Sequence, residues 1–164
     1  MDTIWSPWRS KYIATFKETP SASDCFLCDA AKDIGNDKEM LVLSRKEHCF
    51  VIMNRYPYNN GHLMIAPYSH TGNFEEFTSE MLTELMLTVQ EAINILKKTH
   101  HPHGFNIGMN IGREAGAGVP DHIHVHVVPR WNGDTNFMPV LSDVKIASDS
   151  LENSYDLLLS HFTK

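Results

Sequence analysis

The sequence contains little cysteine, no long apolar run and no signal-peptide pattern. Cysteine occupies only three of the 164 positions, an odd number that does not suit a framework of disulfides. No apolar run approaches the roughly 20 residues that a membrane-spanning helix needs. The N-terminal segment MDTIWSPWRSKYI lacks the apolar core of a signal peptide. These absences argue against a disulfide-stapled secreted domain and a membrane-spanning protein, and we expect a cytoplasmic protein.

Clusters of basic residues are also absent, and acidic residues outnumber basic ones. The chain has 14 Lys and Arg against 20 Asp and Glu, a net charge of −6, with no basic patch suited to a nucleic acid. We therefore expect no nucleic-acid partner, although a small anionic ligand held by local donors fits this composition. The length suits one domain spanning 1–164, with an irregular N-terminal arm at 1–24 and a C-terminal extension at about 147–164.

Alternating apolar residues and turn signals predict strands on both sides of a single long helix. Helix 78–99 begins with Thr78 or Ser79 as its cap and carries an apolar stripe at helical spacing. The stripe consists of Leu82, Leu85, Met86, Val89, Ile93 and Leu96. The predicted strands are 41–44, 48–54, 62–67, 104–112 and 122–128. Strands before and after one long helix indicate the α+β class.

The run DHIHVHVVPRW places a histidine on every second residue, at His122, His124 and His126. In a β-strand these three rings share one face, while the Ile and Val residues between them face a core. At a rise of roughly 3.4 Å per residue the outer two lie about 13–14 Å apart, too far for one small metal ion. The three rings therefore have different functions, unless the run is a solvated strand face that happens to carry histidine.

A glycine-rich loop, GREAGAGVPDH, precedes the histidine run. Backbone N–H groups at Gly116 and Gly118 can approach phosphate oxygens closely, because no Cβ intervenes. A neutral imidazole can attack phosphorus through a ring nitrogen, and neighbouring imidazoles and amides can stabilise charge on the phosphoryl oxygens. The loop and the histidines together indicate a site for phosphate chemistry.

The two cysteines of the segment CFLC, Cys25 and Cys28, have the spacing of a metal-binding or redox pair. Two thiolates at this spacing suit tetrahedral zinc, which needs two further ligands. A redox pair and a pair of thiols without metal are the alternatives. Cys49 lies in an apolar strand and is expected to be a buried thiol.

The segment HIHVHVV resembles the signature of the histidine triad (HIT) superfamily of nucleotide hydrolases and transferases. Four further segments resemble the bacterial branch that includes diadenosine tetraphosphate phosphorylase and hydrolase-like proteins. They are WSPWR, CFLC, NRYPYNNGHLMIAPYSH and NIGREAGAGVPDHIHVHVVPRWNGDTNFMPV, and the similarity covers roughly residues 4–146.

This resemblance implies a HIT-like fold, with a five-stranded antiparallel sheet, one long helix and shorter peripheral helices. It also implies a homodimer without an organic cofactor. The implied reaction is cleavage of a nucleotide or dinucleoside polyphosphate at the α-phosphate, through a covalent histidine–nucleotide intermediate.

The resemblance gives each catalytic histidine a role. His124, the middle histidine of the triad, is the expected nucleophile, and His126 is expected to hydrogen-bond the phosphate oxygens. His62 matches an upstream histidine that lies near the phosphate in the family. The alternative for His62 is a ring at the start of a strand that bonds the adjacent turn.

Candidate substrate-binding residues follow in the same way. Asn54 matches a ribose-contacting position, and Asn110 matches a position beside the scissile phosphate. Hydrogen bonding within a turn or at a strand edge is the alternative for both. Trp131 and Phe137 could stack on a base or belong to a packed loop.

The resemblance also supplies two metal ligands. Some HIT proteins complete a zinc site with a histidine after the third strand and with the first histidine of the triad, which here are His70 and His122. Four protein ligands leave no open position for water, so the zinc is expected to be structural. His122 then serves the metal, while the other two triad rings serve the phosphate.

The loop before the triad departs from the relatives. Animal members related to the fragile histidine triad protein carry a Gln in this loop, where this chain has Ala117 and Gly118. Other phosphorylase-like sequences place a Ser close to Gly118. The choice between hydrolysis and phosphorolysis therefore stays open. The alternative functions are hydrolysis of a nucleoside phosphoramidate, nucleotide sensing with little turnover, and catalysis on an exchangeable metal.

Overall fold

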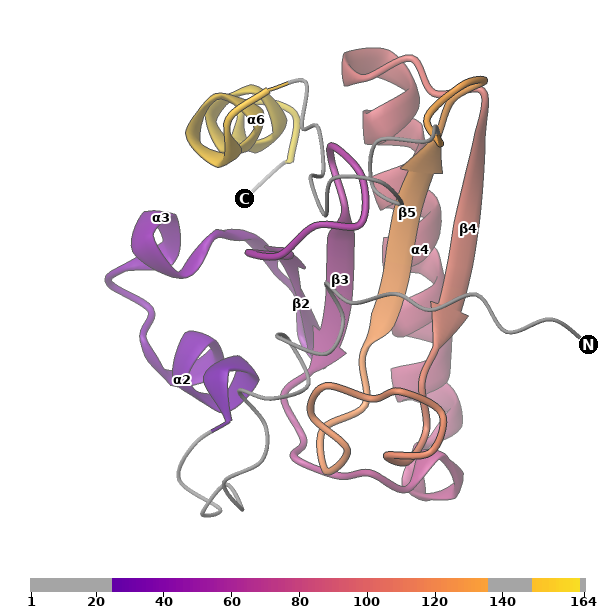
Figure 1. Cartoon of the computed structure of the whole chain (residues 1–164). Helices are drawn as coiled ribbons and strands as arrows, with labels where there is room; N and C mark the ends of the chain where they lie inside the picture. Colours follow the sequence, from indigo (N-terminus) through magenta and orange to yellow (C-terminus); the bar gives the residue numbers. More distant parts are fainter. Residues whose placement is uncertain (1–24, 136–148, 163–164) are drawn as a thin grey trace, which may run out of the picture.

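The fold is an antiparallel sheet with one long helix against it, as the computed structural model shows for residues 25–135 and 149–162 (Figure 1). The sheet has five strands in the order β1-β2-β3-β5-β4. The strands are β1 (Val42–Arg45), β2 (Cys49–Met53), β3 (Leu63–Pro67), β4 (Gly104–Met109) and β5 (Val125–Arg130). The helices are α2 (Phe26–Lys32), α3 (Asp37–Met40), the 3-10 turn η1 (Phe74–Glu76), α4 (Ser79–Thr99) and α6 (Leu151–Leu159). The predicted α+β class and the antiparallel sheet are confirmed.

The centre of the sheet is apolar on both faces. All five residues of β2 and all five of β3 are buried, and the two strands pair antiparallel from Cys49 opposite Pro67 to Met53 opposite Leu63. β5 then pairs with β3 on one side and β4 on the other. Because β5 pairs with β3, the histidine run lies beside the start of β3, where His62 lies.

Helix α4 runs behind the sheet (Figure 1) and contacts β2, β3 and β5. Its predicted cap is confirmed, because the Thr78 hydroxyl accepts a hydrogen bond from the backbone N–H of Met81 at 3.3 Å. The predicted stripe is wrong at Met86, whose side chain is 54% exposed. Met86 lies about 100° around the helix from the buried Leu85 and so points away from the sheet. None of the described helices is both long enough and apolar enough to cross a membrane.

The predicted strand 122–128 is wrong at its beginning. Regular pairing starts only at Val125, so His122 and His124 lie in the segment that leads into β5. Both side chains are buried, at 0% and 6% exposure, as is Ile123 between them. The alternation of histidine with apolar residues therefore does not correspond to one buried face and one solvent-exposed face in this segment. The reason lies in the loop after β3, whose Thr71 carbonyl accepts the Ile123 N–H at 3.0 Å and covers this segment.

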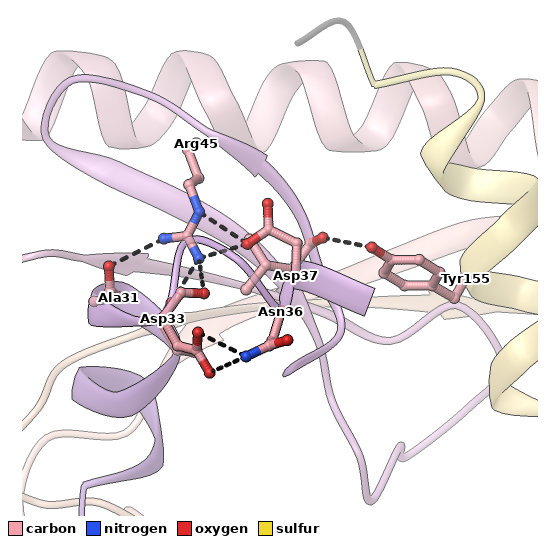
Figure 2. Close-up of polar contacts among 8 residues, drawn as sticks. Ala31, Asp33, Asn36, Asp37, Arg45 and Tyr155 are labelled. Carbon is pink, nitrogen blue, oxygen red and sulfur yellow. Dashed lines mark hydrogen bonds and ion pairs between the residues drawn. The ribbon is translucent and has the colours of Figure 1, made fainter. Parts of the chain in front are cut away.

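One arginine anchors helix α2 to the sheet (Figure 2). The Arg45 guanidinium donates to the carbonyls of Ala30 at 2.7 Å and Ala31 at 3.1 Å, and it pairs with Asp37 at 2.6 Å. These carbonyls belong to the last turn of α2, where carbonyl groups have no hydrogen-bond donor within the helix. Helix α6 lies in the predicted C-terminal extension, and its Tyr155 hydroxyl donates to the Val42 carbonyl of β1 at 2.9 Å. The predicted arm at 1–24 lies outside the described residues.

Candidate functional site

Five histidines and two cysteines gather around the segment leading into β5, in two groups. His122 faces Cys25, Cys28 and His70, whereas His124 and His126 lie with His62. The three histidines of the triad therefore have different surroundings, as the sequence predicts. The first group has the composition of a metal site. The second has the composition of a catalytic site.

The His124 ring has an unprotonated nitrogen, Nε2. Its Nδ1 lies 2.9 Å from the carbonyl oxygen of His122, and a carbonyl can only accept a hydrogen bond. Nδ1 therefore carries the proton, and Nε2 carries the free lone pair. Burial lowers the pKa of His124, which keeps the ring neutral near pH 7. A neutral, buried imidazole with an unprotonated Nε2 is the form that attacks an electrophile.

A hydrogen bond from the His62 ring to the His126 ring determines the tautomer of His126. The Nδ1 of His62 accepts the backbone N–H of Tyr58 at 3.0 Å, so the proton of this ring is on Nε2. That Nε2 lies 2.9 Å from the Nδ1 of His126 and donates to it. The proton of His126 is therefore on its own Nε2, where it is available to a ligand. Burial lowers the pKa of His126 to about 4, so this ring is also neutral at pH 7.

Among these three histidines, His126 is half-buried and so accessible to a ligand, while His62 and His124 are buried. The rings of His124 and His126 lie 4.7 Å apart at 77°, so an edge of one faces the other. Tyr58 packs beside this opening, with its ring 4.6 Å from that of His62 and 5.7 Å from that of His126. Tyr58 is not among the residues that the sequence predicts for the site. Its position four residues before His62, within a turn, was the available signal.

The glycine-rich loop has the backbone conformation that only glycine adopts without strain. Gly112 and Gly116 have φ values of 82° and 84°. The Asn110 side chain spans this loop and donates to the Gly116 carbonyl at 3.2 Å. Gly116 is exposed and Gly118 is half-buried. The structure therefore places Asn110, Gly116 and Gly118 in one loop that ends at the histidine run.

Asn54 and Trp131 lie in other surroundings. The Asn54 amide contacts the His62 ring at 3.3 Å, and its oxygen accepts the Tyr56 N–H at 2.9 Å, which is hydrogen bonding within the turn. Trp131 follows the last residue of β5, about 16 Å along the chain from His126, and its backbone N–H donates to the Asp134 carboxylate. The structure does not bring Trp131 to the triad. Phe137 lies outside the described residues.

In the metal group, formed by Cys25, Cys28, His70 and His122, four of the distances between ligand atoms match those of a tetrahedral site. The Nδ1 of His122 lies 3.3 Å from Cys25 Sγ, 3.5 Å from Cys28 Sγ and 3.3 Å from the Nδ1 of His70. The His70 Nδ1 is 3.2 Å from Cys28 Sγ. In a tetrahedron around zinc, two nitrogens lie about 3.3 Å apart, and a sulfur and a nitrogen about 3.5 Å apart. The four side chains therefore fit one tetrahedral ion that bonds two thiolates and two imidazoles.

The hydrogen bonds around this group also favour a metal. His122 Nε2 donates to the Pro67 carbonyl at 2.9 Å, which leaves the lone pair on Nδ1, facing the cysteines. Burial raises the pKa of the Cys25 thiol to about 11, so that a nearby cation is needed to hold it as a thiolate at pH 7. Cys49 is buried elsewhere, beside Thr88, as predicted.

Gly72 allows the loop that carries His70 to pack against the loop that carries His122. The sequence does not single out this glycine. A Cβ on Gly72 would lie 2.6 Å from the carbonyl oxygen of Pro120, closer than real atoms approach. Gly72 follows the ligand His70 by two residues, and Pro120 precedes the ligand His122 by two residues. Position 72 must therefore be glycine for these two ligands to lie this close together.

Comparisons with known proteins identify relatives of this chain. A HIT domain family model matches residues 36–133. The chain is 37% identical to a Mycobacterium tuberculosis protein named AP-4-A phosphorylase, over 100% of this chain and 86% of the relative. It is 32% identical to an uncharacterized HIT-like protein of Methanocaldococcus jannaschii, over 66% of this chain and 82% of the relative.

A solved Zn-bound histidine triad family protein from Mycobacterium smegmatis superposes with a TM-score of 0.67 at 25% identity, covering 84% of this chain and 92% of the other. The diadenosine triphosphate hydrolase of Plasmodium falciparum superposes with a TM-score of 0.61 at 21% identity, covering 74% and 75%. The second likeness concerns the fold alone. The family match, the full-length relative and the shared fold together show that this chain belongs to the HIT family.

Proposed function

We propose that this protein is an enzyme that cleaves dinucleoside polyphosphates at the α-phosphorus through a covalent His124–nucleotide intermediate. One observation carries the proposal. The His122 carbonyl holds the proton of His124 on Nδ1, which leaves the Nε2 lone pair for attack. The 37% identical relative named AP-4-A phosphorylase supports a substrate of this class.

The proposed first step transfers a nucleotidyl group to the enzyme. The Nε2 lone pair of His124 forms a bond to the α-phosphorus, and the bond from phosphorus to the bridging oxygen breaks. The remaining polyphosphate leaves with that oxygen and its electron pair. His126 carries its proton on Nε2 and lies beside His124, so its N–H can donate a hydrogen bond to the phosphoryl oxygen on which charge develops. His62 holds His126 in this tautomer and is a positioning residue.

The proposed second step releases the nucleotide. An oxygen of a water molecule or of inorganic phosphate bonds to the phosphorus, the nitrogen–phosphorus bond breaks, and its electrons return to His124 Nε2. A water acceptor also releases one proton to the solvent. The Gly116 N–H already donates to the Arg113 carbonyl at 2.9 Å, so the Gly118 N–H is proposed to hold a phosphate oxygen during both steps. The Asn110 side chain supports the loop by donating to the Gly116 carbonyl. Ala117 and Gly118 add no side-chain donor for a phosphate acceptor.

We propose zinc as the ion of the cysteine–histidine group. Two thiolates and two imidazoles form a common structural zinc set, and four protein ligands leave no position open for water. When bound, the ion cross-links α2, the loop after β3 and the segment before β5. A cytoplasmic location, also proposed, would keep both thiols reduced.

We also propose that the enzyme is a homodimer formed through β4. This strand is the last in the sheet order, with a neighbour on one side only among the described residues. Ile107 of β4 and Ile111 just after it are 46% and 49% exposed. Apolar side chains on a long open edge favour pairing with a second copy. Ile107→Glu should give a monomer by light scattering, whereas Ile34→Glu, at the 73% exposed Ile34, should leave the mass unchanged.

Incubation with diadenosine tetraphosphate tests the function. AMP and ATP formed without phosphate would identify a hydrolase, and ADP formed only with phosphate would identify a phosphorylase. His124→Ala should abolish either reaction, while His161→Ala, at an exposed histidine of the C-terminal segment, should retain it. Cleavage of a nucleoside phosphoramidate alone, or no turnover of any substrate, would refute the proposed substrate class.

A further inference from the structure

His122 is in contact with both groups of the site. Its ring Nδ1 belongs to the metal group, 3.3 Å from Cys25 Sγ, and its Nε2 donates to the Pro67 carbonyl. Its backbone carbonyl, in turn, accepts the Nδ1 proton of His124 at 2.9 Å. One residue thus joins the metal ligands to the nucleophile across a few covalent bonds.

The strand ladder does not hold this carbonyl. Regular pairing of β5 begins at Val125, three residues later. The His122 N–H donates to Val119 at 3.2 Å within its own loop, and the next N–H, that of Ile123, donates to Thr71 at 3.0 Å. Thr71 itself follows the metal ligand His70. The contacts that orient the carbonyl therefore come from the ring of His122 and from the loop that carries a second metal ligand.

We propose that the metal group positions the nucleophile: an ion bound by Cys25, Cys28, His70 and His122 fixes the His122 carbonyl, and this carbonyl holds His124 in the tautomer with a free Nε2. The inference rests on the proposed function and adds to the structural role expected for zinc. Cys28 and His70 are then positioning residues for catalysis, although neither contacts the triad rings that bind substrate.

The alternative tautomer of His124 shows why the carbonyl matters. If the carbonyl turns away, the proton can move to Nε2, and that nitrogen then has no lone pair for phosphorus. Loss of one neutral hydrogen bond changes an equilibrium by about twofold to tenfold. We therefore expect loss of the ion to lower kcat by the same factor, about twofold to tenfold. KM should change little, because Gly116, Gly118 and His126 do not bind the ion.

The test uses the full chain, purified with zinc, before and after treatment with a strong chelator, together with three variants. His70→Ala removes an exposed ligand, His70→Cys replaces it by another ligand that zinc accepts, and Cys49→Ser removes a buried thiol outside the group. Two-dimensional ¹⁵N–¹H spectra of the imidazoles report the tautomer of His124. Steady-state kinetics separate kcat from KM, and circular dichroism reports the fold.

The metal-free protein and His70→Ala should stay folded, show an Nε2–H signal for His124 and lose kcat with KM retained. His70→Cys with zinc should restore the Nδ1–H signal and kcat, and Cys49→Ser should match the parent protein. A metal-free protein that keeps the Nδ1–H tautomer would overturn the inference. Global unfolding on metal loss would overturn it as well, because the ion would then act on the whole fold. If no substrate is turned over, the proposed function fails, while the tautomer spectra still decide this inference.

Discussion

Gly72→Ala should weaken the protein at the junction of the two loops that carry His70 and His122. The added Cβ would lie 2.6 Å from the Pro120 oxygen and 3.4 Å from the Cα of Asp121, and both of these are backbone atoms. Backbone cannot rotate away as the end of a side chain can, so one of the loops must shift. Overpacking of this kind costs about 1–3 kcal/mol of unfolding free energy.

Gly35→Ala is the matched control, because a Cβ there meets nothing within 4 Å and the residue does not need a positive φ. Replacing such a glycine by alanine should leave stability unchanged or raise it by about 0.4–1 kcal/mol. Urea denaturation of both variants, with zinc and with chelator, measures the difference. The loss in Gly72→Ala should be larger with zinc, since the shift separates His70 from His122. Equal stability of the two variants would refute the account of this junction.

Three further predictions concern the histidines and the metal. His62→Ala should lower kcat by about 10- to 100-fold, since His126 loses the donor that sets its tautomer, and His161→Ala should have no effect in the same kinetic assay. The folded-state pKa of His126, about 4, lies below its usual 6.5, so the unfolded chain binds more protons between these values. Its contribution to stability should therefore be complete above pH 6.5 and decline as the pH falls through about 4, which urea titrations across this range would measure. Zinc removal should lower the unfolding midpoint of the parent protein, and a midpoint independent of chelator would contradict a bound structural ion.

Periodicity predicted the five strands and the long helix α4, but it did not predict the shorter helices α2, α3 and α6. The apolar runs of β2 and β3 and the spacing along α4 gave strands and a helix at their observed places within a few residues. Two errors share one cause. Met86 is exposed and His124 is buried because neighbouring elements decide burial, and those neighbours come from distant parts of the chain.

The sequence predicted which cysteines and histidines come together, but it did not predict the proton positions on the rings. The spacing of Cys25 and Cys28 indicated a metal, but His70 and His122 were added through the resemblance to a family, because they lie far along the chain. The proton positions depend on the backbone carbonyl of His122 and on the N–H of Tyr58. No sequence pattern encodes those contacts, since every residue carries the same backbone groups.

Detection of the covalent intermediate tests the central claim most directly. The protein is mixed with diadenosine tetraphosphate, quenched within one turnover without acid, digested and examined by mass spectrometry. We predict one nucleotidyl group on the peptide that contains His124, and none in the His124→Ala variant. A nucleotidyl group on another residue, or turnover by His124→Ala at the parent rate, would contradict the proposed mechanism.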